Sequence, residues 1–345
     1  MKVSVIIPSR PDDPHLRNCL SVLFSAITAE MEVIVVADGW QPKGIGMGIK
    51  KQKFRIIPVE KQGPAGCRHH GALHAHHEWL CFLDSDVLVH ENTFVDAFSL
   101  LEENGDDGLV GSYDDTPTDP ALVSRFRNLL HHYHHQQNAG MSGVFWGAFT
   151  IVRKSAYVEV GGFDPSFDAA SVEDIDLGYR LSDKGFTVVL RPQVQVTHLK
   201  KWTLSNMIRT DIFLRAKPWT LLLNKYSRWG IGRLNTTRKE KLSAALSVSG
   251  ALLGFLSITG ILGWYPFFLT LLLFLMLQQD FYRFAFGHFR KTDMPFIICL
   301  HHLYYFSAIT GWFLAKVELL FKNISMMRFN MRSAIKSLSA TRSSK

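Results

Sequence analysis

Two carboxylates follow a short apolar run, in a position that suits chemistry on a phosphate-bearing substrate. Residues 79–83 are all apolar, as is typical of a buried strand. Asp84 and Asp86 follow them, separated by one residue. In an open α/β sheet, ligands bind at the carboxyl ends of the strands. Mg²⁺ or Mn²⁺ takes one or two carboxylates there and completes its shell with substrate phosphates. Surface turns also produce Asp-x-Asp, so its meaning depends on the surrounding elements.

The residues around this pair predict strands that alternate with helices. We expect strands at residues 2–7, 32–37, 54–59, 79–83, 108–113, 144–152, 187–190 and 194–198. We expect helices at residues 13–29, 63–77, 91–103, 120–137 and 173–184. Such alternation predicts an α/β domain with a mainly parallel sheet over residues 1–200.

Charge is distributed unevenly along the 345 residues. The whole chain has a net charge of +8, but residues 200–241 carry +9 and residues 242–345 carry +7, so residues 1–199 are acidic at −8. The basic balance therefore does not indicate nucleic-acid binding. A basic region beside apolar runs is instead attracted to anionic lipid headgroups.

Cysteine usage and the N-terminus favour a cytosolic setting for residues 1–200. The four cysteines are Cys19, Cys67, Cys81 and Cys299, and they show no pair spacing. We interpret them as reduced thiols. The N-terminus begins directly as a strand, so we expect no signal peptide.

The C-terminal part predicts a membrane anchor. Residues 242–264 contain no charged side chain and are long enough to cross a bilayer, and further apolar runs follow at 266–278 and 294–315. We expect about three transmembrane helices within residues 242–321, between a basic juxtamembrane segment at 201–241 and a basic tail at 322–345.

The distribution of cations also predicts an orientation. The positive-inside rule places the 201–241 segment, and with it residues 1–200, on the cytoplasmic side of a multi-pass protein. Three spans would put the basic tail on the opposite side, which the rule disfavours. A third run that is re-entrant or interfacial therefore stays an alternative.

Six short stretches occur in a fixed order along residues 1–200. They are VSVIIPSR at 3–10, VVADG at 35–39, GPAGCRHHG at 63–71, FLDSD at 82–86, GGFD at 161–164 and EDIDLGYRL at 173–181. This order resembles the inverting glycosyltransferases of family 2. The resemblance implies a GT-A fold, which is Rossmann-like, and sugar transfer from a nucleotide-sugar donor at the cytoplasmic leaflet.

The resemblance assigns donor-binding roles to Pro8, Ser9, Asp38, Arg68 and Asp84. Asp38 would accept an N–H from a pyrimidine base, and the planar guanidinium of Arg68 would reach the base or the diphosphate. A UDP-sugar is the favoured donor. Two positions depart from the family pattern, because Ala37 replaces a second acid and His69 replaces an asparagine.

The resemblance also assigns a metal and a base. Asp86 would hold Mn²⁺ or Mg²⁺ on the diphosphate, and Asp84 would bind the ribose or the cation. His198 resembles a further metal ligand of some members, although an ordinary strand-end histidine is the other interpretation. Asp174 matches the general base that takes the proton of an acceptor hydroxyl. Acids in a first helical turn also favour the helix dipole without any catalytic role.

Acceptor-side roles fall on a further set of residues, namely Trp146, Gly147, Glu173, Asp176 and Trp202. Trp146 could pack on a sugar face. The sequence HLKKW at 198–202 matches only part of the Gln-x-x-Arg-Trp motif of processive polysaccharide synthases. Three short spans are also few for a polymer channel, so we disfavour a processive synthase.

Two histidine groups share predicted helix faces. They are His70, His74 and His77, and His131, His134 and His135. A zinc site needs four ligands at defined spacing, usually including cysteine or an acid. We therefore favour packing or partial exposure for these histidines.

The sequence thus predicts a membrane-anchored, metal-dependent inverting glycosyltransferase. We expect it to act on a hydroxyl of a lipid-linked or membrane-proximal acceptor, because the basic, Trp-bearing stretch at 200–241 leads into the apolar region. One alternative is a polyprenyl-phosphate sugar synthase, whose ionised phosphate acceptor needs no base. The other is a non-enzymatic membrane scaffold with a degenerate transferase domain.

Overall fold

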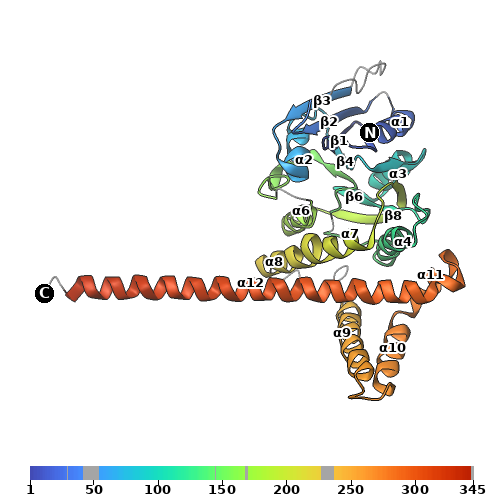
Figure 1. Ribbon diagram of the computed structural model, residues 1–345. Helices are drawn as coiled ribbons and strands as arrows, with labels where there is room; N and C mark the ends of the chain where they lie inside the picture. Colours follow the sequence, from blue (N-terminus) through green and yellow to red (C-terminus); the bar gives the residue numbers. More distant parts are fainter. Residues whose placement is uncertain (29, 42–53, 144, 168–169, 227–236, 343–345) are drawn as a thin grey trace. The chain divides into compact units, whose positions relative to one another are not determined.

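The computed structural model describes residues 1–28, 30–41, 54–143, 145–167, 170–226 and 237–342 (Figure 1). It contains two compact units. The first includes Met1–Met207 and Gln278–Leu300, and the second includes Ile208–Gly230, Arg238–Leu277 and His301–Lys345. Residues 227–236, within the basic segment predicted at 201–241, lie outside the described residues.

One mixed sheet forms the centre of the first unit, with the strand order β3-β2-β1-β4-β7-β6-β8-β5. The strands are β1 (Val3–Ser9), β2 (Glu32–Asp38), β3 (Phe54–Val59), β4 (Trp79–Leu83), β5 (Val87–Val89), β6 (Gly108–Tyr113), β7 (Phe149–Arg153) and β8 (Val188–His198). Neighbouring strands from β3 to β4 are parallel, whereas β7 is antiparallel to β4 and β6, and β5 to β8. The α/β expectation is therefore met, but the sheet is parallel throughout only in its β3 to β4 half.

Helices cover both faces of this sheet. In chain order they are α1 (Leu16–Ala26), α2 (Gly63–Leu73), α3 (Thr93–Asn104), α4 (Leu122–Gln137), α5 (Lys154–Glu159) and α6 (Glu173–Asp183). Helices α1 and α3 pack on one face, and α2, α5 and α6 pack on the other. Side chains of a strand alternate between faces, so Val5 and Ile7 contact the first group while Ile6 contacts the second. The central strands are consequently apolar on both sides.

Two strands differ from the expected boundaries in a way that affects the site. Strand β7 starts at Phe149 rather than at residue 144, so Trp146 and Gly147 precede it in a loop. The two strands expected at 187–190 and 194–198 form one strand, β8, whose pairing with β6 shifts register between Val110 and Ser112. This bulge allows the strand to continue past Pro192, which lacks an N–H.

The remaining helices follow β8. They are α7 (Leu204–Arg209), the π-helix η1 (Thr210–Ala216), α8 (Lys217–Lys225), α9 (Arg238–Ile258), α10 (Tyr265–Leu277), α11 (Gln279–His288), the 3₁₀ turn η3 (Lys291–Asp293) and α12 (Met294–Arg342). In the described part of the chain, two helical stretches, Arg238–Ile258 and Lys291–Met327, are long and apolar enough to cross a membrane. Helices α10 and α11 would add a third span only as one element, and they are bent by 76°.

Helix α11 packs on helix α4 of the first unit. Phe281 contacts the rings of Phe126 and Tyr133, with centroid distances of 6.2 and 5.3 Å. Arg125 donates a hydrogen bond to the His288 carbonyl, and its guanidinium lies over the Phe289 ring at 4.9 Å. Residues after the second apolar run therefore return to the first unit.

Candidate active site

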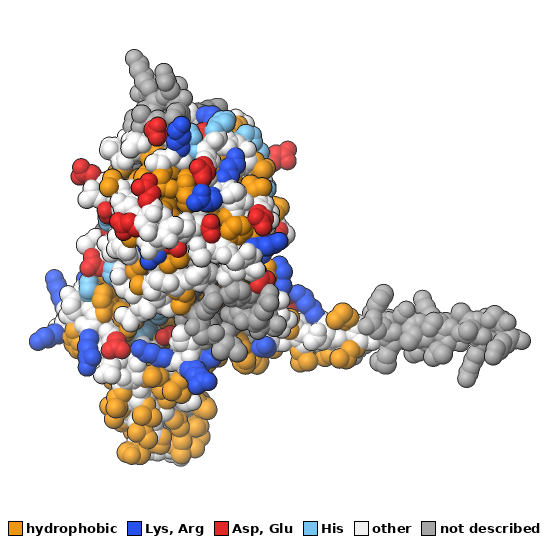
Figure 2. Space-filling model, turned by 180° about the vertical axis from the view of Figure 1, so that it is seen from behind, with side chains coloured by type: hydrophobic (Ala, Val, Ile, Leu, Met, Phe, Trp, Pro, Cys, Tyr) orange, Lys and Arg blue, Asp and Glu red, His pale blue; other side chains and the backbone are white. Residues whose placement is uncertain are grey.

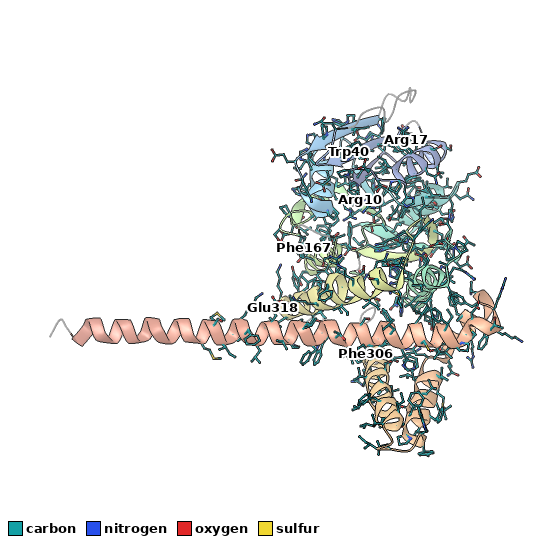
Figure 3. All side chains as sticks on the ribbon, viewed as in Figure 1. Arg10, Arg17, Trp40, Phe167, Phe306 and Glu318 are labelled. Carbon is teal, nitrogen blue, oxygen red and sulfur yellow. The ribbon has the colours of Figure 1, made fainter. Side chains whose placement is uncertain are left out.

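The carboxyl ends of three adjacent strands meet at one edge of the sheet. Strands β1, β2 and β4 are parallel neighbours, so Ser9, Asp38 and Asp84 stand at the same edge. The Trp40 indole Nε1 donates to the Ser9 carbonyl at 2.9 Å, and the Gln62 N–H donates to Asp38 Oδ1 at 2.8 Å. Figure 3 labels Trp40 at this edge. Pro8 pairs with β2 within the sheet, so its neighbour Ser9 stands at the strand end.

Arg68 links two of the predicted acids. The residue is 4% exposed, and its guanidinium donates from Nη2 to Asp84 Oδ1 at 2.6 Å and from Nη1 to Glu173 Oε1 at 2.9 Å. A Cβ at Gly147 would lie 2.6 Å from Arg68 Nη2, so only glycine allows this approach. Arg68 therefore connects α2, the end of β4 and the start of α6. Its two carboxylate partners therefore occupy the guanidinium N–H groups that we expected to bind the donor.

Asp174 is held at the start of α6, beside this ion-paired group. The Gly147 N–H donates to its Oδ2 at 3.2 Å, and the Ile175 N–H donates to its Oδ1 at 2.8 Å. Burial and the neighbouring Glu173 charge raise the pKa of Asp174 to about 7, although Arg68 opposes them. A carboxylate with this pKa gains and loses a proton near neutral pH, as a general base must.

Asp86 and His198 face one another on the other side of Asp84. Asp86 Oδ2 lies 3.6 Å from His198 Nε2, which is too long for a hydrogen bond. Asn128 Oδ1 lies 2.7 Å from His198 Nδ1, and the Tyr113 ring stacks on the imidazole with centroids 4.1 Å apart. When Asn128 accepts from Nδ1–H, the neutral ring presents its Nε2 lone pair toward Asp86.

This pair fits a divalent cation that is shared with a substrate. Among the described residues, no cluster of three or more His, Cys, Asp or Glu side chains has a metal-binding arrangement. A carboxylate oxygen and an imidazole lone pair 3.6 Å apart nevertheless match the two protein ligands that Mn²⁺ or Mg²⁺ needs when phosphates supply the rest. The carboxylate of Asp84 is already engaged by Arg68, so it contributes charge beside this pair.

The residues expected on the acceptor side separate into two groups. Trp146 and Gly147 lie at the site, because Gly147 donates to Asp174 and Trp146 packs edge-on against Tyr113 at 4.4 Å. Glu173 is buried against Arg68. Asp176 is fully buried and paired with Arg180 Nε at 2.8 Å, which anchors α6 to the loop before it.

Trp202 belongs to the interior of the first unit. Its indole is 4% exposed, with the Lys200 ammonium 4.2 Å and the Arg127 guanidinium 5.5 Å from its ring centre. The backbone N–H of Trp202 donates to Ser124 Oγ on α4. The tryptophan therefore fixes the segment after β8 against α4.

Sequence reasoning missed Asn128 and Tyr113, which orient His198. Both sit within predicted elements, and nothing in their spacing to residue 198 indicates a contact. Tyr113 does end a predicted strand, which is the one signal that could have suggested it. The histidines of α4 also have packing partners, since His131 stacks on Tyr113 and His135 packs on Trp146.

Comparisons with known proteins find glycosyltransferases that are similar to this chain. Residues 4–161 match the family model described as glycosyl transferase family 2. The chain is 26% identical over 119 residues to the poly(ribitol-phosphate) beta-N-acetylglucosaminyltransferase TarP of Staphylococcus aureus strain N315, which covers 32% of this chain and 36% of TarP. It is 31% identical over 98 residues to the N-acetylglucosaminyl-diphospho-decaprenol L-rhamnosyltransferase of Mycobacterium tuberculosis strain CDC 1551 / Oshkosh, covering 28% of this chain and 32% of that protein. The chain thus spans about a third of the length of these curated relatives.

A solved structure supports the fold over most of the chain. The mannosyltransferase PcManGT from Pyrobaculum calidifontis, in complex with GDP-Man and Mn²⁺, superposes with a TM-score of 0.60 at 17% identity, covering 90% of this chain and 87% of that one. The mixed sheet flanked by helices is accordingly of the GT-A type. The chain is therefore similar to family 2 glycosyl transferases over residues 4–161, and it shares the fold of a solved glycosyltransferase.

Proposed function

We propose that this chain is a membrane-associated, metal-dependent inverting glycosyltransferase. It transfers a sugar from a nucleotide-sugar donor to a hydroxyl of a lipid-linked or membrane-proximal acceptor. The observation that carries the proposal is the bridge from Asp84 through Arg68 to Glu173, which sets the strand-end acids and Asp174 around one centre.

Asp174 supplies the base. Its raised pKa allows it to accept the acceptor hydroxyl proton while that oxygen attacks the anomeric carbon. The bond between the anomeric carbon and the diphosphate breaks as the new glycosidic bond forms, so the configuration inverts. The Gly147 N–H holds one Asp174 oxygen and thereby orients the carboxylate.

Asp86 and His198 are the residues that would hold the cation. A divalent ion bound there would offset the negative charge of the departing nucleoside diphosphate. Asn128 and Tyr113 fix the His198 ring, so the chain itself contributes ligand orientation. Arg68 keeps Asp84 in place and limits the negative charge at the centre.

The donor base is proposed to lie beside Asp38 and Ser9, with a UDP-sugar as the favoured donor. Asp38 stands at the end of β2, although one of its oxygens already accepts from the Gln62 N–H. The structural relative PcManGT was solved with GDP-Man, so a guanine nucleotide is the donor class to test against uridine.

The acceptor is proposed to be lipid-linked. The name of the mycobacterial relative specifies a diphospho-decaprenol acceptor, and the apolar helices of this chain are compatible with membrane association. The polyprenyl-phosphate synthase remains the rival, since a phosphate acceptor needs no base. The scaffold alternative predicts neither donor binding nor turnover.

The test is donor hydrolysis by the detergent-solubilised full chain with a panel of UDP-, GDP- and dTDP-sugars, in Mn²⁺, Mg²⁺ or EDTA. We expect one donor to be turned over only with metal, and we expect Asp86→Ala to remove the metal-dependent part. If no donor is hydrolysed, calorimetric binding of each donor with Mn²⁺ follows. Absence of binding as well would refute the proposal and favour the scaffold.

A further inference from the structure

The helices α9 and α10 form a hairpin in the second unit that carries no charge beyond its first four residues. No Asp, Glu, Lys, Arg or His occurs from residue 242 to residue 279. The buried side of α9 consists of small residues, and a Cβ at Gly254 would lie 3.1 Å from the Phe267 ring. Small residues allow such close helix packing where lipid surrounds a helix pair.

The outer surface of the hairpin is hydrophobic on both arms and at the tip. Phe255 and Ile258 on α9 are 61% and 74% exposed, and Phe268 on α10 is 58% exposed. Between them, Ile261 at the tip is 68% exposed. Figure 2 shows hydrophobic side chains over the visible face of the hairpin. A second copy of the chain would cover one side only, whereas lipid covers both arms and the tip.

Polar groups at the tip are satisfied within the hairpin. The backbone N–H groups of Ile261 and Leu262 both donate to the Leu256 carbonyl, at 3.0 and 3.1 Å. The Ser257 hydroxyl lies 3.1 Å from the Gly263 carbonyl, and the Thr259 hydroxyl donates to the Phe255 carbonyl. A turn in water needs no such closure, but a turn in hydrocarbon does.

The α10 arm is too short to carry the tip through a bilayer. Helix α10 has 13 residues, which corresponds to about 20 Å, whereas the hydrocarbon core is about 30 Å thick. Helix α9 has 21 residues and is long and apolar enough to cross a membrane by itself, but the chain must return through α10, so the shorter arm limits how deep the tip can reach. Trp264 and Tyr265 at the tip are residue types that favour a membrane interface. The α10 arm is too short for them to reach the interface on the far side of the bilayer.

Helix α12 lies at the charged base of this hairpin. Tyr305 is near the middle of its apolar run, yet the Tyr305 hydroxyl donates to Glu240 Oε2 at 2.6 Å. His302 hydrogen-bonds Ser247 and stacks on Phe274 at 3.8 Å. If residues 294–315 crossed the bilayer, their midpoint would lie in hydrocarbon and would take Glu240 with it, at a high desolvation cost.

The next turns of α12 also contact a charged element. Glu318 pairs with Lys217 Nζ at 2.9 Å, and a Cβ at Gly311 would lie 2.5 Å from Ala216. Figure 3 labels Glu318 and Phe306 on α12. Helix α12 is thus packed against the polar start of α9 and the basic α8 segment over residues 302–318.

We propose that α9–α10 is a re-entrant membrane hairpin and that α12 stays at the surface from which the hairpin enters. The C-terminal tail then remains on the same side as the catalytic unit, among anionic lipid headgroups. This arrangement replaces the three spans expected from the sequence and removes the conflict with the positive-inside rule. It rests on the membrane association in the proposed function and is independent of the chemistry.

Cysteine labelling in sealed membrane vesicles tests the topology of the full chain. In a Cys299→Ser background, the remaining native cysteines are buried. New cysteines replace exposed Glu103 on α3, Gly263 at the tip, where a Cβ meets open space, and Ser344 in the tail. An impermeant maleimide is applied to vesicles of both orientations.

We expect Glu103→Cys and Ser344→Cys to react from the same side, and Gly263→Cys to react from neither side until detergent is added. Reaction of Gly263→Cys from the opposite side would replace the re-entrant hairpin with two full spans. Reaction of Ser344→Cys from the opposite side would show that α12 crosses the membrane. Reaction of Gly263→Cys on the same side as Glu103→Cys would place the hairpin in water and overturn the membrane association.

A charge at the tip gives a second, independent measurement. We expect most of the Ile261→Asp protein to be absent from the salt-washed membrane fraction, because a carboxylate in hydrocarbon is strongly disfavoured. Val95→Asp is the matched control, since Val95 is 62% exposed on α3 of the catalytic unit. Equal membrane retention of both variants would refute a lipid-embedded tip. Donor binding by solubilised Ile261→Asp separates failure of this inference from failure of the proposed function.

Discussion

The two sides of the candidate active site differ in how complete they are without a substrate. On the side of Asp174, the charges are already paired, because Arg68 bridges Asp84 and Glu173 and two backbone N–H groups hold the Asp174 carboxylate. On the side of Asp86, one carboxylate and one imidazole face each other across 3.6 Å without a hydrogen bond.

This difference suggests a division of labour. The side of Asp174 is preorganised by buried ion pairs, which fix the base before the acceptor arrives. The side of Asp86 provides a partial ligand set whose completion requires a cation and the donor diphosphate. Substitutions on the first side should therefore affect chemistry and stability, and those on the second side should affect donor and metal binding.

Asp174→Asn tests most directly whether the two sides of the site have separate roles. For a hydroxyl acceptor we expect the transfer rate to fall by about 10²–10⁴-fold, because Asn cannot accept the proton. Donor binding with Mn²⁺, measured by calorimetry, should stay unchanged. A small effect on transfer would instead indicate an acceptor that is already ionised, such as a lipid phosphate. Loss of donor binding would show that the two sides are not separable.

Arg68→Gln should have the largest effect on stability. Removing the cation leaves the buried carboxylate of Glu173 and the partly exposed carboxylate of Asp84 without their cationic partner, which costs about 3 kcal/mol. Chemical denaturation of the solubilised chain measures the loss.

Arg55→Gln is the matched control. Arg55 pairs with Glu32 at 2.9 Å, but its side chain is 38% exposed, so we expect a loss nearer 1 kcal/mol or less. Similar losses for the two variants would mean that Arg68 is not structurally special. Arg68→Lys keeps one charge without the fork and should fall between Arg68→Gln and the native chain.

Asn128→Leu tests the other side of the site. Without an acceptor at Nδ1 the His198 ring loses its orientation, and we expect Mn²⁺ affinity in the presence of UDP to weaken by about 10–100-fold. Asn128→Asp keeps an acceptor and should retain most of the affinity. If both variants bind Mn²⁺ like the native chain, His198 is an ordinary strand-end histidine.

The pH profile gives the smallest but most specific effect. Because the pKa of Asp174 is raised to about 7, the base is protonated below this value, so transfer should rise with pH and reach half its maximum near 7. Glu173→Gln removes a neighbouring charge that contributes to the raised pKa, so the acid limb should move to lower pH. An unchanged limb in this variant would show that Asp174 is not the titrating group.

Much of the fold could be predicted because it depends on local patterns. Apolar runs of five to seven residues gave the positions of β1, β2 and β4, and the strand ends placed Asp38 and Asp84 at one edge. The sequence could not give the direction of β7, since an antiparallel partner for β4 uses the same apolar residues as a parallel one. The parallel character of the sheet was overestimated for this reason.

The partners within the site were beyond local patterns. Arg68 and Glu173 are separated by 105 positions, and Asn128 and His198 by 70. Arg68 was expected at the donor, and the structure places its guanidinium between two carboxylates. The roles assigned to these residues stay predictions until the variants are measured.

The sequence by itself determined the residue types, their order and the apolar runs, and these were enough to indicate a glycosyltransferase domain followed by apolar helices. Periodicity and strand ends are properties of neighbouring residues, so they can be read along the chain. Only the tertiary structure decided which polar groups meet. The Arg68–Glu173 ion pair and the hydrogen bond from Tyr305 to Glu240 both depend on how distant segments of the chain pack together. The structure also showed that Tyr305 of α12 contacts Glu240 at the start of α9, and this contact is the basis for proposing different membrane placements for the two apolar stretches.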